Sequence, residues 1–228
     1  MINKIKPVFK NECVFKKHIV VTGHFGSGKT NVAVNLAFYL RSLGKSVTVA
    51  DIDIVNPYFR SADNAVSLRA AGIRCIVPVH ANTNVDMMAV PAELNSVFDG
   101  GSDYNILDVG GDDTGAAVLG TLFRRLESAG YDMLYVVNMY RPLIAEETDA
   151  AELMKQIEKN SRLRCTAIVN NSNLGEETDG EAVSASLGYA DRVAEKTGLP
   201  LAFDSVCIDF DDFGRNIFYM NDVTKKRY

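Results

Sequence analysis

The stretch that decides the fold is Gly23-His24-Phe25-Gly26-Ser27-Gly28-Lys29-Thr30, which matches the phosphate-binding pattern G-x-x-x-x-G-K-[ST]. Residues 18–22 before it are typical of a short buried strand, and residues 29–43 after it carry apolar side chains at helical spacing. Glycines let a backbone adopt positive φ and approach an anion closely, and the N-terminus of a helix favours negative charge. A glycine-rich turn without a ligand is the alternative, but the elements on both sides favour a phosphate site.

This phosphate loop predicts a role for each type of residue in it. Lys29 is expected to reach the β- and γ-phosphates of a nucleotide as a catalytic cation, and the hydroxyl of Thr30 to bind Mg²⁺. The loop backbone is expected to surround the phosphates, at Gly23, Gly26, Ser27 and Gly28.

The rest of the chain alternates between predicted strands and helices. Strands are expected at 18–22, 46–50, 74–77, 104–108, 133–137, 166–170 and 200–203, and helices at 29–43, 86–98, 115–129, 145–161 and 182–197. Such alternation predicts an α/β three-layer fold with a mostly parallel central sheet covered by helices on both faces. In these folds, ligands bind at the carboxyl ends of the strands.

Length and composition favour one folded domain. The chain has 228 residues, 47% of them hydrophobic, and contains no repeat or proline-rich linker. We therefore expect a single nucleotide-binding domain over 18–228, preceded by a lysine-rich lead segment over 1–17. A hairpin or edge strand is the favoured interpretation of that segment, and a partner-binding arm is the alternative.

Charge and hydropathy exclude several classes of partner. A net charge of -5 argues against nonspecific nucleic-acid binding, and no apolar run approaches the roughly 18 residues that cross a membrane. We expect a cytoplasmic protein. The cysteines are interpreted as small buried apolar residues because they are scattered and form no C-x-x-C pair: Cys13, Cys75, Cys165 and Cys207.

Acidic residues end two predicted strands. Asp108 is expected to bind Mg²⁺ opposite Thr30, and Gly110 and Gly111 directly after it to contact the γ-phosphate and to move after hydrolysis. A helix cap followed by an ordinary turn is the alternative.

Asp51 and Asp53 follow the strand at 46–50, and residues two apart in a strand point the same way. Asp53 is predicted to orient the attacking water and Asp51 to complete the metal shell. Local turn chemistry is the alternative.

Asparagines follow the strand at 166–170. Asn170 is expected to contact the base, since a carboxamide offers both a donor and an acceptor. Guanine-specific loops carry an aspartate where this chain has Asn173, so adenine is the predicted base. Simple turn formation by Asn residues is the alternative.

Together these motifs resemble the MinD/ParA group of P-loop ATPases, and in particular an uncharacterised bacterial ATP-binding branch of it. The resemblance rests on the phosphate loop at 23–30, Asp51-x-Asp53, Asp108-x-Gly110-Gly111 and the segment 169–178. It implies ATP bound with Mg²⁺, slow hydrolysis to ADP, and a nucleotide-dependent switch.

One departure from the group concerns self-association. Deviant phosphate loops of the group carry a signature lysine directly after the first glycine, which reaches the partner's nucleotide in a dimer; this chain has His24 there. We expect a monomer, or a dimer that does not use such a lysine.

The leading hypothesis is a Mg²⁺-dependent ATP-binding protein with slow ATPase activity that acts as a switch or metabolic accessory protein, with a protein partner or small-molecule substrate that the motifs do not name. The alternative is an ATP-dependent synthetase or kinase of the dethiobiotin or cobyrinate type. Polar residues at 80–86 could form its pocket for a small acidic substrate, or they could form a loop that caps a helix. A third interpretation is an ATP sensor without turnover.

Overall fold

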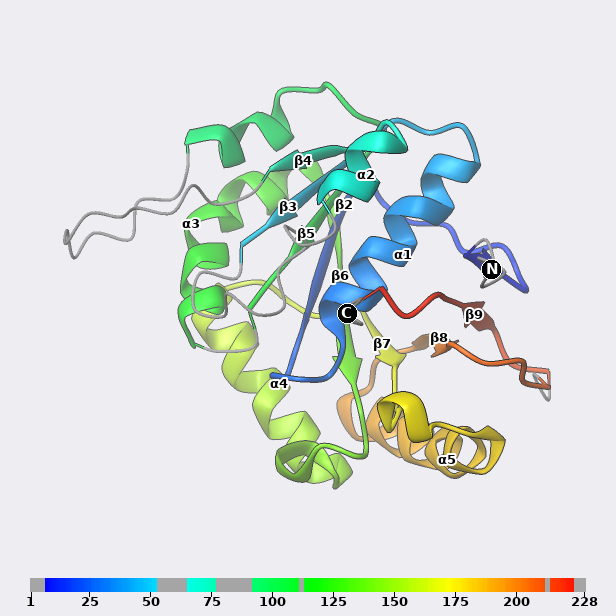
Figure 1. The fold of residues 1–228 in the computed structure, drawn as a ribbon. Coiled ribbons are helices and arrows are strands. Elements are labelled where there is room, and N and C mark those ends of the chain that lie inside the picture. The colour runs from blue at the N-terminus through cyan, green and yellow to red at the C-terminus, as the bar shows by residue number, and fades with distance from the viewer. Residues whose placement is uncertain (1–6, 53–64, 77–91, 111–112, 212–213, 224–228) are drawn as a thin grey trace, which may run out of the picture.

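The computed structural model describes residues 7–52, 65–76, 92–110, 113–211 and 214–223, which form one α/β sandwich (Figure 1). Its sheet has the strand order β1-β9-β8-β7-β6-β2-β5-β3-β4. The strands are β1 (Val8–Phe9), β2 (His18–Gly23), β3 (Val47–Asp51), β4 (Arg74–Ile76), β5 (Tyr104–Asp108), β6 (Tyr131–Val137), β7 (Ala167–Asn170), β8 (Leu201–Val206) and β9 (Ile217–Tyr219). All neighbours are parallel except β1 and β9.

Helices cover both faces of this sheet. The α-helices are α1 (Lys29–Ser42), α2 (Ala65–Ala70), α3 (Asp113–Ala129), α4 (Glu147–Ser161) and α5 (Gly180–Thr197), and the 3₁₀ helices are η2 (Ala92–Phe98), η3 (Pro142–Ile144) and η4 (Gly175–Glu177). Alternate residues of β2 enter opposite cores: Ile19 packs with α1 and α2, whereas Val20 packs with α3, α4 and α5. The predicted three-layer fold is confirmed.

The sequence prediction missed several short elements, and one predicted helix is different. Between 86 and 98 the described part, Ala92–Phe98, is a 3₁₀ helix, and 77–91 lie outside the described residues. The elements that were not predicted are α2, β9 and the 3₁₀ helices η3 and η4. Three to six residues are too few to show a hydrophobic period.

The described part of the lead segment contributes an edge strand, as its favoured interpretation predicts. Val8 and Phe9 pair antiparallel with Tyr219 and Phe218. The Phe9 ring is buried and stacks on Phe218, with 4.1 Å between ring centroids. This segment therefore shares the core of the main domain.

The segment after β9 runs along α1. The Asn35 side chain donates to the carbonyl of Asn221 at 2.8 Å and accepts from its N–H at 2.9 Å. Asn31 accepts from the N–H of Val223 at 2.9 Å. Two asparagines of one helix thus bind the backbone of this segment and hold it against α1.

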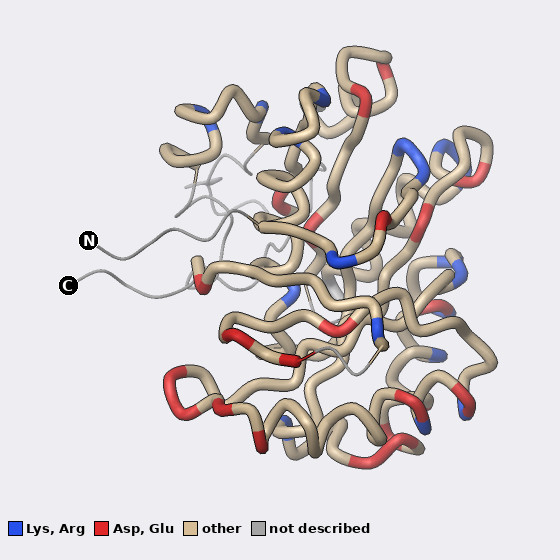
Figure 2. The backbone as a smooth tube through the Cα atoms, turned by 90° about the vertical axis from the view of Figure 1, so that its right-hand side faces the viewer, with Lys and Arg blue, Asp and Glu red and all other residues tan. Residues whose placement is uncertain are grey.

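Basic and acidic positions are interspersed along the backbone on the side of the molecule shown in Figure 2.

Among the described residues, no helix combines the length and the apolar character needed to cross a bilayer.

Candidate functional site

The phosphate loop connects β2 to α1 in a conformation that depends on its glycines. Gly23, Gly26 and Gly28 have φ of 146°, 75° and 87°, values that other residues rarely adopt. A side chain at Gly23 would also overlap the carbonyl oxygen of Val136 in β6. Gly28 is the N-cap of α1 and offers no side-chain cap, so the first turn of the helix remains suited to an anion.

Three side chains hold the carbonyl groups of this loop. Lys29 Nζ donates to the His24 carbonyl at 3.0 Å, Arg141 Nε to that of Gly26 at 2.7 Å, and Asn171 Nδ2 to that of Ser27 at 2.7 Å. In a planar trans peptide the C=O and N–H groups point in opposite directions. Fixing the Ser27 carbonyl therefore also fixes the direction of the Gly28 N–H, and the loop is shaped before any ligand arrives.

The predicted metal residues come together at the start of α1. Thr30 Oγ1 donates to Asp108 Oδ2 at 2.7 Å, and Asp51 lies in register with Asp108 on the neighbouring strand. Both carboxylates are buried, each with 2% of its surface exposed. One hydroxyl and two carboxylates are a hard oxygen donor set of the kind that Mg²⁺ prefers, so these residues fit that ion.

Asp53 and Gly111, the predicted water-orienting residue and phosphate sensor, lie outside the described residues. Gly110 is buried against α3: a side chain on Gly115 would come within 2.6 Å of the Gly110 carbonyl oxygen. This close approach requires glycine at 115. The roles of Asp53, Gly110 and Gly111 stay predictions.

Asn170 points into the protein. Its Nδ2 donates to Ser186 Oγ at 3.0 Å and to Asp204 Oδ1 at 2.8 Å, and its Oδ1 accepts from the N–H and the hydroxyl of Ser172. It is 2% exposed and does not line the cavity described next. The structure therefore places Asn170 behind the site, where it holds the loop that follows β7.

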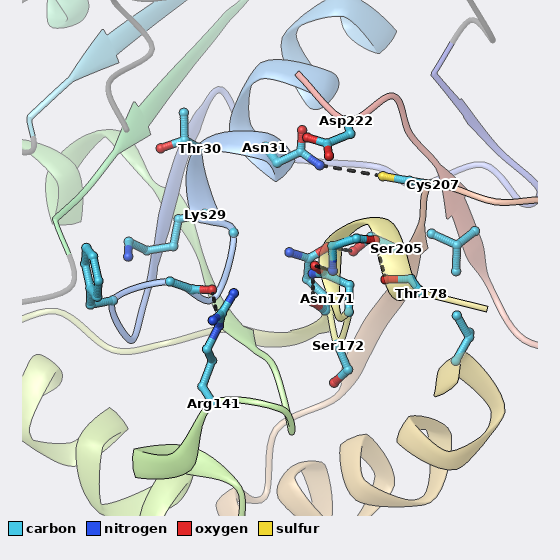
Figure 3. Close-up of a pocket in the computed structure, with 17 residues that line it drawn as sticks. Lys29, Thr30, Asn31, Arg141, Asn171, Ser172, Thr178, Ser205, Cys207 and Asp222 are labelled. Carbon is cyan, nitrogen blue, oxygen red and sulfur yellow. Dashed lines mark hydrogen bonds between the residues drawn. The ribbon is translucent and has the colours of Figure 1, made fainter. Parts of the chain in front are cut away.

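A cavity of about 290 Å³ extends from the phosphate loop toward the ends of β7 and β8 (Figure 3). Lys29 and Arg141 lie on one side of it, and Ser205, Cys207 and Asp222 lie on the other. Asn173 lines it too, but its side chain is engaged in a local turn, donating to the Asn171 carbonyl at 2.7 Å and accepting from the Gly175 N–H at 3.1 Å.

Sequence reasoning missed several residues of this cavity, namely Arg141, Ser205, Cys207 and Asp222. Each stands in a segment without a recognisable motif. Arg141 and Cys207 could have been found from their place in the chain, because they closely follow β6 and β8. The carboxyl ends of parallel strands meet at one edge of the sheet, where ligands bind. Of the four cysteines that were expected to be buried, Cys165 is buried, Cys13 and Cys75 are partly buried, and Cys207 is exposed, which corrects the expectation.

His24 is held neutral. Burial lowers the pKa of its imidazole, and the positive charges of Lys29 and Arg141 lower it further, whereas a hydrogen bond with the backbone of Phe25 raises it. At pH 7 this position therefore carries no permanent cation.

Comparison with known proteins agrees with this architecture. The model of the ParA family, described as the NUBPL iron-transfer P-loop NTPase, matches residues 14–97. No curated protein sequence matches the chain significantly.

Solved structures with a similar fold include two proteins described as signal recognition components and one described as a cell division protein. The receptor FtsY from Elizabethkingia anophelis is 19% identical with a TM-score of 0.56, covering 84% of this chain and 59% of its own. The 54 kDa signal recognition particle protein from Aeropyrum pernix K1, in complex with GDP, is 18% identical with a TM-score of 0.56, and the match covers 92% of this chain and 45% of that protein. The cell division protein FtsY from Thermotoga maritima is 20% identical with a TM-score of 0.54, and the match covers 90% of this chain and 65% of that protein.

These findings define the class: the chain has the P-loop NTPase fold. The match over 14–97 confirms its resemblance to the MinD/ParA group within that class. The chain spans about half the length of the first two of these solved structures. Nucleotide binding is the activity that this class suggests.

Proposed function

We propose that this protein binds ATP with Mg²⁺, hydrolyses it slowly, and acts in the cytoplasm as a nucleotide-dependent switch or metabolic accessory protein. The contact of Thr30 with Asp108, beside Lys29 at the start of α1, is the observation that carries the proposal. A hydroxyl and a carboxylate at this place are the residues that hold the metal in P-loop NTPases.

Each part of the proposed mechanism belongs to a named residue. Mg²⁺ would be held by Thr30 and Asp108 with Asp51 nearby, and when bound it supplies positive charge against the terminal phosphates. Lys29 exchanges its hydrogen bond to the His24 carbonyl for the phosphates. Asp53 orients the attacking water.

The glycines after β5 would report the state of the nucleotide. Gly110 and Gly111 contact the γ-phosphate and move when it leaves. Because Gly110 packs closely on Gly115, such a movement would reach α3 directly.

Adenine is the base we propose, since Asn173 stands where a guanine reader would carry a carboxylate. Guanine is the second candidate, because Asp222 lines the far side of the cavity and the A. pernix relative was solved with GDP. A carboxylate accepts from two neighbouring N–H groups, which guanine offers and adenine does not.

Calorimetry with ATP and GTP, each with and without Mg²⁺, tests this proposal. We expect tighter binding of ATP and a loss of affinity when Mg²⁺ is removed. The same titrations are made with Lys29→Ala, which removes the cation of the phosphate loop. Its control is Lys155→Ala, which removes an exposed lysine of α4. Equal or tighter binding of GTP would overturn the choice of base, and no binding of either nucleotide would overturn the proposal.

Turnover assays separate the switch from the alternatives. Slow hydrolysis of ATP alone supports a switch, product formation only with a small acidic metabolite supports a synthetase or kinase, and binding without turnover supports a sensor. The residues at 80–86 that such a metabolite would contact lie outside the described residues.

We also propose that self-association, where it occurs, does not depend on residue 24. The imidazole of His24 is neutral and shorter than lysine. Light scattering with a nonhydrolysable ATP analogue tests this, and an ATP-induced dimer that disappears in His24→Ala would contradict it.

A further inference from the structure

Arg141 is a second basic side chain at the phosphate loop, and it does not belong to any motif found in the sequence. It lies beyond the end of β6 and is the N-cap of η3, where its N–H donates to the Asn138 carbonyl and its carbonyl accepts from the Ile144 N–H. Hydrogen bonds therefore hold both the N–H and the carbonyl group of Arg141. From this position the side chain crosses to the phosphate loop, as Figure 3 shows.

The contact with the loop is close. Arg141 Nε donates to the Gly26 carbonyl at 2.7 Å, and a side chain on Gly26 would come within 3.3 Å of the same nitrogen. Gly26 therefore gives the guanidinium its access to the loop. The side chain also lines the cavity, so it faces the space that a nucleotide would fill.

No carboxylate balances this charge among the residues that the structure describes. The ion pairs there involve Arg164, Arg192 and Arg215, whereas Arg141 has a neutral carbonyl as its acceptor. Its charge and that of Lys29 both lower the pKa of His24, which shows that the two cations act on the same loop. Arg141 thus brings to the phosphate loop a positive charge that no described carboxylate balances, and it faces a cavity that an anion could enter.

We propose that Arg141 is a phosphate-binding residue, which exchanges the Gly26 carbonyl for a terminal phosphate of the bound nucleotide. This inference rests on the proposed nucleotide binding and adds a contact to it. A guanidinium presents several N–H donors in a plane that matches phosphate oxygens, and a charged acceptor binds it more strongly than a carbonyl does. Arg141 would thus be a second positively charged side chain that binds the phosphates, at a loop where the neutral imidazole of His24 supplies no charge.

Substitutions that separate charge from hydrogen bonding test this assignment. Arg141→Gln keeps an N–H donor without the charge, and Arg141→Lys keeps the charge without the planar fork. Arg192→Ala removes an exposed arginine of α5 and is the control. ATP affinity is measured by calorimetry for each variant at several KCl concentrations, and circular dichroism checks the fold.

We expect Arg141→Gln to weaken ATP binding on the order of tenfold to a hundredfold and to reduce its dependence on salt. Arg141→Lys is expected to keep an intermediate affinity and the parental salt dependence, and Arg192→Ala to match the parent.

If Gln and Lys weaken binding equally with unchanged salt dependence, Arg141 only shapes the loop and the inference is wrong. Parental affinity in both variants would also refute it. A parent protein that binds no nucleotide would instead refute the proposed function.

Discussion

Gly28→Ala is the substitution whose cost the structure defines best. Gly28 has a φ of 87°, and left-handed backbone costs a residue with a Cβ roughly 1–2 kcal/mol. The new methyl group would also overlap the amide nitrogen of Asn171, which donates to the Ser27 carbonyl at 2.7 Å. Moving that amide loses a hydrogen bond with a net value of about 0.5–1.5 kcal/mol. We therefore expect a total destabilisation of about 1.5–3.5 kcal/mol.

Urea unfolding of Gly28→Ala and of a matched control measures this cost. Gly44 has a similar φ of 79° and no atom within 4 Å of an added Cβ, so Gly44→Ala should show the backbone cost alone. In an Asn171→Ala background the two alanine substitutions should become equally costly, because the overlapping amide is gone. If Gly28→Ala costs no more than Gly44→Ala in the parent, then Asn171 does not restrain the loop and the reasoning is refuted.

Three further outcomes are expected. Lys29→Ala should abolish ATP binding in calorimetry, because it removes the loop's own cation; unchanged affinity would refute the phosphate-loop assignment. Asp53→Asn should bind ATP like the parent but hydrolyse it more slowly in a phosphate-release assay, and parental turnover would remove Asp53 from the mechanism. Burial, with a smaller contribution from Asp132, raises the pKa of Cys13 from 9.0 to about 11. Because the unfolded thiol ionises first, the free energy of unfolding should fall as pH rises from about 9 to 11; Cys13→Ala should lack this component of the fall, and an identical urea-unfolding pH profile would contradict the assignment.

The phosphate loop was predictable because its constraints are local: a strand, glycines that permit positive φ, and a helix follow one another in the chain. Thr30 and Asp108 could be paired in advance because strand ends in a parallel sheet meet at one edge. Asn170 was less accessible to such reasoning. Its partners Ser186 and Asp204 lie 16 and 34 residues away, and nothing local shows that they occupy its amide.

Arg141 was missed because its partner, like those of Asn170, is distant in the sequence. Its distance of 115 residues from Gly26 hides the contact, and an arginine in a loop is by default a solvated surface residue. The short strand β9 was unpredictable for another reason, since three residues are too few to show a hydrophobic period. The helix predicted over 86–98 is a 3₁₀ helix in its described part, Ala92–Phe98.

The pairing of β1 with β9 has a consequence for the order in which the protein acquires its structure during synthesis. Phe9 leaves the ribosome early, but its stacking partner Phe218 is made more than two hundred residues later. Asn221, which the Asn35 side chain binds, is made 186 residues after Asn35. Until then, one side of α1 and the first strand expose apolar surface that has no partner. A nascent chain halted before residue 217 should therefore hold a formed central sheet with an open edge, and should be the stage at which the protein is most prone to aggregation.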